Sequence, residues 1–158
     1  MKIIFTILIL SLSIAPLHAQ EKESVNWLTF EQLSDSLKVN PKKVLISFHA
    51  DWCAYCRKMH REVFTRPDII EQLNSDYYAV SFDAETRDSV YFDGQVFVNK
   101  QATDARRGSH ELAWLFASRN GQIVLPATIV LDENFSVVHR SFEYLGPRNL
   151  VKILLRYQ

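Results

Sequence analysis

The sequence has few glycines and cysteines, and neither sign of charge is in excess. Its 158 residues include four glycines, two cysteines, 18 Lys and Arg, and 18 Asp and Glu. The glycines are too widely spaced for a dinucleotide-binding or phosphate-binding loop, since both motifs need glycines within one short turn. A formal charge of zero gives no basic face for DNA or RNA, so we expect no nucleic-acid partner. Two cysteines are too few for a small fold held together by disulfides.

The N-terminal segment is strongly apolar. Lys2 precedes an apolar run that ends at Ile14, and the small residue Ala19 follows soon after. A basic start, a short apolar stretch and a small residue describe a secretory signal peptide, and the run is shorter than the roughly 20 residues of a membrane-spanning helix. We therefore expect a signal peptide over residues 1–19 and one domain over residues 20–158. This domain would work outside the cytoplasm, where disulfides persist; an uncleaved N-terminal anchor is the alternative.

The rest of the chain alternates β-rich runs with amphipathic segments. With 47% hydrophobic residues it can fill a core, and its length suits one α/β domain. Short β-rich runs are typical of strands, and apolar residues three or four apart are typical of helices. These patterns predict strands over residues 43–49, 77–82, 90–92, 95–98, 127–131 and 136–139. They predict helices over residues 27–37, 53–64, 68–73, 109–116 and 147–154.

Local signals mark several of these boundaries. Thr29 begins a capping-box pattern, which is typical of a helix start. Asp68 and Ser109 are expected to cap the helices that follow them. The dipeptide Asp93-Gly94 favours the positive backbone angles of a tight hairpin turn.

Both cysteines fall in the run DWCAYC, which follows a predicted strand and opens a predicted helix. A thiol at a helix N-terminus faces unpaired backbone N–H groups and the positive end of the helix dipole, which favour the thiolate. Cys56 lies one turn after Cys53 and can reach the same sulfur. This spacing predicts a redox-active pair in which Cys53 is the exposed nucleophile and Cys56 the more buried resolving thiol. Two inert buried thiols or a purely local disulfide are the alternative.

The run VLISFHADWCAYCRKM resembles the strand, Trp-Cys-x-x-Cys motif and helix of the thioredoxin superfamily. LPAT followed by IVLDEN is similar to its cis-proline loop and next strand, and Gly146 with the last amphipathic helix matches its C-terminal element. The chain looks most like secreted bacterial thioredoxin-like thiol–disulfide oxidoreductases. The resemblance implies an α/β, thioredoxin-like fold with a central mixed β-sheet flanked by helices, and an inserted β-hairpin and helix near residues 88–118.

The resemblance also implies a function and roles for single residues. Pro126 would be cis and face the cysteine pair, and the backbone of Leu125 would pair with an extended substrate segment. Trp52 would form part of the apolar surface around the active thiol. The protein would be a monomer in the bacterial periplasm without a cofactor. It would exchange disulfides with protein substrates, as a reductase rather than an oxidase or isomerase, and an upstream redox partner protein would restore the dithiol.

Two positions depart from the thioredoxin pattern. Thioredoxins carry a buried Asp six residues before the first cysteine, and Ser47 stands there in this chain. The Lys that partners this Asp appears here as Ala79. Another group must then take the proton of the resolving thiol, and His49, four residues before Cys53, is the candidate proton partner.

Two other functions fit parts of the sequence. His49, Cys53, Cys56 and His60 are ligand types for zinc or copper, so a metal-binding protein is one alternative. His49 is expected on a strand and the other three on a helix, which makes convergence on one ion unfavourable. The missing carboxylate at Ser47 motivates the other alternative, a thioredoxin-fold binding or chaperone-like module.

Overall fold

The structure is a computed structural model that describes residues 23–102 and 108–157. The expected signal peptide, residues 1–19, lies outside the described residues and stays a prediction. In chain order the elements are β1 (Trp27–Leu28), α1 (Phe30–Val39), β2 (Lys43–His49), α2 (Ala54–Glu62), α3 (Pro67–Asp76), β3 (Tyr77–Asp83), β4 (Val90–Phe92), β5 (Gln95–Phe97), α4 (Glu111–Phe116), β6 (Ser118–Arg119), β7 (Gln122–Ile123), β8 (Ala127–Leu131), β9 (Val137–Ser141) and α5 (Pro147–Arg156).

A five-stranded sheet in the order β1-β3-β2-β8-β9 forms the centre of the fold. β1, β3 and β2 run parallel, whereas β8 runs antiparallel to β2 and β9 antiparallel to β8. The predicted mixed sheet with flanking helices is therefore confirmed. In the described part of the chain, no helix is long and apolar enough to cross a membrane.

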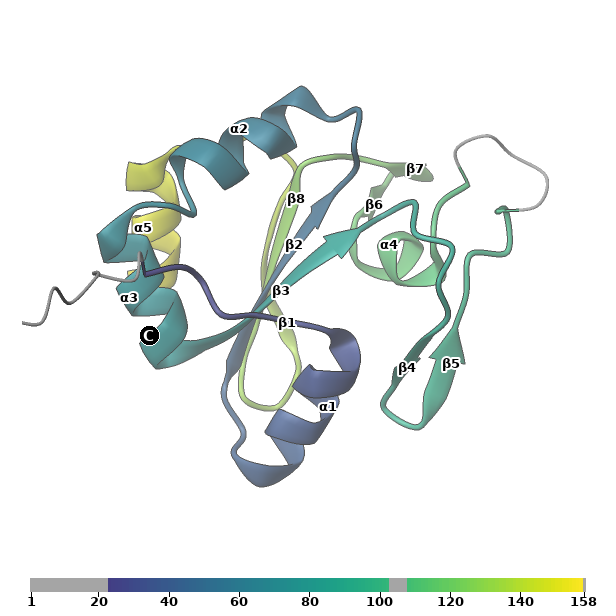
Figure 1. The fold of residues 1–158 in the computed structure, drawn as a ribbon, viewed down its shortest axis with the longest axis horizontal. Coiled ribbons are helices and arrows are strands. Elements are labelled where there is room, and N and C mark those ends of the chain that lie inside the picture. The colour runs from purple at the N-terminus through teal and green to yellow at the C-terminus, as the bar shows by residue number, and fades with distance from the viewer. Residues whose placement is uncertain (1–22, 103–107, 158) are drawn as a thin grey trace, which may run out of the picture.

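Helices cover both faces of this sheet (Figure 1). Side chains of β2 alternate between two cores: Ile46 and Phe48 lie in one cluster and Leu45 in the other. The first cluster includes residues of α1, α4 and the β4–β5 hairpin, and the second includes residues of α2, α3 and α5. β2 is therefore buried on both faces, which explains its continuous apolar run.

The start of α1 matches its predicted capping box. Thr29 Oγ1 accepts the Gln32 N–H at 3.2 Å, and the Gln32 side chain accepts the Thr29 N–H at 2.9 Å. The prediction that Trp27 belongs to this helix is wrong: Trp27 lies in β1, in register with Ala79 of β3. Its ring packs edge-on against Phe64 at 5.0 Å between centroids. Trp27 is spaced like a helical residue relative to Phe30, but it lies before the N-cap Thr29 and therefore outside the helix.

Two other helix starts differ from the sequence prediction. α3 begins at Pro67 after Arg66, rather than with Asp68 as its cap. Proline suits this first position because the first helical N–H has no partner within the helix. α4 is capped by the buried His110 rather than by Ser109, since His110 Nδ1 accepts a first-turn backbone N–H at 3.2 Å.

The predicted insertion is confirmed as the β4–β5 hairpin and helix α4, between β3 and β8. Its turn has positive φ angles, 50° at Asp93 and 74° at Gly94, as the sequence predicted. The ring of Phe92 packs edge-on against Phe30 of α1 at 5.2 Å between centroids. The hairpin is therefore part of the main core. The β6–β7 hairpin was not predicted, because strands of two residues are too short for a periodic pattern.

Candidate functional site

Two segments that are distant in the sequence meet at the C-terminal end of β2. β8 runs antiparallel to β2, so the start of β8 lies beside the end of β2, with Phe48 in register with Ala127. Cys53 follows the end of β2, and the loop before β8 contains the Leu125–Pro126 peptide bond, which is cis. The strand register therefore places the cysteine pair and the proline loop at the same end of the sheet.

Cys53 occupies the N-cap of α2. Its Sγ accepts the backbone N–H of Cys56 at 3.2 Å. This N–H belongs to the first helical turn, where backbone donors have no partner within the helix. In the reduced protein the same donor and the helix dipole would favour a thiolate on Cys53 over a thiol.

The two cysteines are joined in a disulfide with an S–S length of 2.05 Å. Cys53 is only 4% exposed and Cys56 2% exposed. The expectation of an exposed Cys53 is therefore wrong for the disulfide state, although Cys53 is the more accessible of the two. Its sulfur is turned toward the N–H of the first helical turn, which draws it away from solvent.

Aromatic side chains flank the disulfide on the surface. Trp52 is 50% exposed and its indole Nε1 donates to Glu85 Oε1 at 2.9 Å. Tyr55 is 62% exposed, and its ring lies 6.1 Å from that of Tyr144 between centroids. Leu125 is half-buried and Pro126 buried. Two exposed aromatic residues, Trp52 and Tyr55, therefore adjoin Cys53 and Cys56 in the chain, whose disulfide is nearly buried.

The two departures from the thioredoxin pattern lie in the central sheet. Ser47 is buried in β2, in register with Ser81 on one side and Thr128 on the other. Ala79 is buried in β3, in register with Leu45. Neither position can supply a charged group to the resolving thiol.

A second cluster lies behind the cysteine pair. A cavity of about 240 Å³ is lined by His49, Ala50, Asp51, Cys56, Arg57 and His60. The rings of His49 and His60 meet edge-on at 5.3 Å between centroids. Burial lowers the pKa of both imidazoles; the carboxylates of Asp83 and Asp51 oppose this for His49, whereas His49 lowers the pKa of His60 further. Both histidines lie near the cysteines in the sequence. The sequence analysis grouped His49 with His60 only as candidate metal ligands and did not predict the contact between their rings.

The metal-binding alternative does not fit this geometry. Both sulfurs are bonded to each other, and no free cysteine occurs in the described part of the chain. Among the described residues, no group of three or more His, Cys, Asp or Glu side chains is arranged to hold a metal ion.

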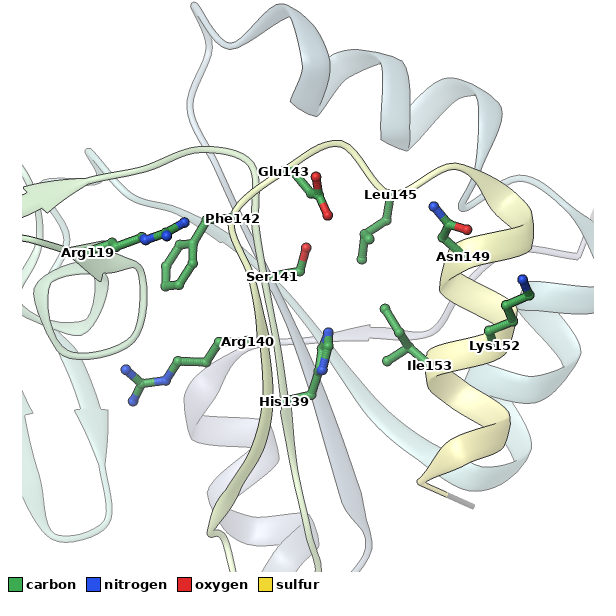
Figure 2. A pocket seen from close by; sticks show the side chains of 10 residues that line it. All are labelled: Arg119, His139, Arg140, Ser141, Phe142, Glu143, Leu145, Asn149, Lys152 and Ile153. Atoms are coloured by element: carbon green, nitrogen blue, oxygen red, sulfur yellow. The ribbon is translucent and has the colours of Figure 1, made fainter.

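A larger hollow lies away from the disulfide, between β9 and α5 (Figure 2). It has a volume of about 520 Å³ and includes Arg119, Arg140 and Lys152 in its lining. None of its lining residues belongs to the cysteine pair or the proline loop. This hollow is therefore separate from the Cys53–Cys56 disulfide.

A family model described as a thioredoxin-like domain matches residues 30–158. Over 36 residues the chain is 42% identical to thiol:disulfide interchange protein DsbD 2 of Pseudomonas aeruginosa. That stretch is 23% of this chain and only 6% of the relative, so the chain spans a small part of that protein.

Solved structures share the fold over most of the chain. A thioredoxin from Thermus thermophilus has a TM-score of 0.60 and 18% identity, with 84% of this chain and 86% of that one covered. DsbH oxidoreductase has a TM-score of 0.57 and 16% identity, with 85% and 87% covered. The reduced C-terminal domain of DsbD from Neisseria meningitidis has a TM-score of 0.52 and 16% identity, with 80% and 90% covered. Given the family match from residue 30 to residue 158 and the paired cysteines at the start of α2, the chain belongs to the thioredoxin-like domain family and has the fold and cysteine pair of a thiol–disulfide oxidoreductase.

Proposed function

We propose that this protein is an extracytoplasmic thiol–disulfide oxidoreductase that reduces disulfides in protein substrates. The observation that carries the proposal is the Cys53–Cys56 disulfide at the N-cap of α2, because this position stabilises a thiolate and holds the resolving thiol beside it. The signal-peptide pattern of residues 1–19 supports a location outside the cytoplasm, the bacterial periplasm. The likeness to thioredoxin supports the direction, from reduced protein to substrate disulfide.

The electrons pass through the two cysteines of the protein and come from a dithiol partner. The thiolate of reduced Cys53 attacks one sulfur of a substrate disulfide, forms a mixed disulfide and releases one substrate thiolate. Cys56 then attacks Sγ of Cys53, which restores the Cys53–Cys56 disulfide and releases the second substrate thiolate. Two electrons pass to the substrate, and an upstream dithiol protein, itself oxidised to a disulfide, supplies two more to reduce the cysteine pair again.

The surface around the disulfide suits a polypeptide substrate. Trp52 and Tyr55 present exposed rings beside the sulfurs, and small molecules are usually bound in deeper concave sites. The backbone of Leu125, next to the cis bond to Pro126, would pair with an extended substrate segment by strand addition. Trp52, Leu125 and Pro126 are therefore the proposed substrate-binding residues.

Insulin reduction tests this function. Catalytic amounts of the protein are expected to accelerate the reduction of insulin by dithiothreitol, measured by the onset of turbidity as the B chain precipitates. Cys53→Ser serves as the matched control and is expected to give the rate of dithiothreitol alone. A wild-type protein no faster than dithiothreitol, or a Cys53→Ser variant equal to wild type, would overturn the proposal and favour the binding or chaperone-like module.

A further inference from the structure

Cys56 must lose its proton before it can attack, yet it is nearly fully buried. A thiolate is the attacking species in disulfide exchange, and burial in apolar surroundings disfavours it. Ser47 and Ala79 stand where thioredoxins carry an Asp and a Lys, and neither has a carboxylate or an amine to assist. We propose that His49 accepts the thiol proton of Cys56, with Asp83 favouring His49 over His60 as the imidazole that carries it. This inference rests on the exchange reaction proposed above.

A shared cavity connects the two groups. His49, at the end of β2, and Cys56, in the first turn of α2, line the same hollow of about 240 Å³. A water molecule occupies about 30 Å³ in the liquid, so the hollow has room for bridging water between them. Water in this hollow can therefore carry a proton from Cys56 to His49.

Charges around the pair select His49 as the acceptor. Asp83 is the register partner of His49 on the neighbouring parallel strand, and Asp51 lies in the loop that follows β2. Both carboxylates stabilise a positive charge on His49. Arg57 of α2 also lines the hollow, and its guanidinium donates to the Asp51 backbone carbonyl.

His60 has the opposite surroundings. Its ring lies among those of Trp27, Phe64 and His49, with centroids 5.7, 5.4 and 5.3 Å away. Its Nε2 is buried and has no hydrogen-bond partner among the described residues. A charge on His60 would be poorly solvated and would repel a charged His49. His60 therefore stays neutral while His49 takes the proton.

Burial supports this assignment, because it lowers the pKa of His49 and keeps the imidazole neutral at pH 7. In the resolving step, the Cys56 S–H bond breaks and its proton goes to His49. The new thiolate attacks Sγ of Cys53, the bond from Cys53 to the substrate sulfur breaks, and the substrate leaves as a thiolate. His49 then returns its proton to this thiolate or to solvent, so protons and electrons balance.

A two-phase reaction with 5,5′-dithiobis(2-nitrobenzoate) separates this step from the first attack. Reduced Cys53 releases one coloured thiolate as it forms a mixed disulfide, and Cys56 releases the second as it resolves it. In the wild type, the second rate is expected to rise with pH through the pKa of His49, which burial lowers from its ordinary value. In His49→Asn, the second rate should be at least about tenfold slower at pH 7 and should keep rising beyond the ordinary thiol pKa near 8.5, because burial disfavours the Cys56 thiolate.

Three further variants make the outcome specific. Asp83→Asn retains an oxygen for the Glu85 N–H that Asp83 accepts at 3.0 Å, but removes the charge; it should move the second-phase midpoint to lower pH. His60→Phe keeps the aromatic packing and should slow the second phase less than His49→Asn does. His139→Asn changes another partly buried histidine, on β9, and should change neither phase.

Failure of this inference and failure of the proposed function give different results. An unchanged second-phase pH profile in His49→Asn, or a larger effect of His60→Phe, would overturn the role of His49 while the first phase still supports exchange at Cys53. A wild-type protein without a fast first phase would instead overturn the oxidoreductase function. A far-UV circular dichroism spectrum equal to that of the wild type shows that each variant is folded.

Discussion

Replacing Cys56 with serine is expected to stop turnover and leave the protein covalently attached to its substrate. Cys53 retains the N-cap position and the helix N–H donors that favour its thiolate, so it can still attack a disulfide. The resolving sulfur is missing, and the mixed disulfide therefore persists. Non-reducing electrophoresis and mass spectrometry of Cys56→Ser with a disulfide-containing substrate should show a complex linked through Cys53.

Cys53→Ser is the matched control for this trapping experiment. Both cysteines are nearly buried, so either substitution removes one sulfur from a similar environment. Cys53→Ser should form no complex, because Cys56 is not at the helix N-cap and lies deeper. Trapping by Cys53→Ser and not by Cys56→Ser would reverse the assigned roles. Equal turnover by both variants and wild type would contradict exchange at this pair.

Phe92→Ala is expected to destabilise the whole domain by about 3–5 kcal/mol, as for other buried Phe to Ala substitutions. Phe92 is 6% exposed and its ring lies 5.2 Å from those of Phe30 and Phe135 between centroids. Since small domains unfold with only about 5–15 kcal/mol, the loss would be a large fraction of the total. Chemical denaturation of the oxidised protein measures it.

The neighbouring Tyr91 provides the control for Phe92. It lies on the same strand, β4, but is 54% exposed, so Tyr91→Ala should change the free energy of unfolding by less than about 1 kcal/mol. If Phe92→Ala were as mild as Tyr91→Ala, the insertion would be an independent appendage, contrary to its place in the core.

The strand that leads to the site could be predicted with its exact bounds because burial on both faces leaves an unbroken apolar run, KVLISFH. The turn at Asp93-Gly94 could also be predicted, since few residues adopt positive φ. Trp27 could not be assigned correctly, because its pairing with Ala79 depends on a strand 50 residues away in the chain and not on local pattern.

The candidate site was predicted in its residues but not in its arrangement. The motif DWCAYC located both cysteines, yet their low exposure depends on how Sγ of Cys53 turns onto the first helical turn. The contact between His49 and His60 depends on how α2 crosses the sheet. The role of Asp83 depends on strand register. Neither crossing nor register is encoded in local periodicity.

The equilibrium reduction potential of the Cys53–Cys56 pair tests the central claim most directly. It is measured by equilibrating the protein in glutathione redox buffers, quenching with acid and counting free thiols. Catalytic exchange predicts a potential between about −270 and −120 mV, with a reductase at the more negative end of that range. A potential below about −300 mV, typical of structural disulfides, would contradict catalysis by this pair.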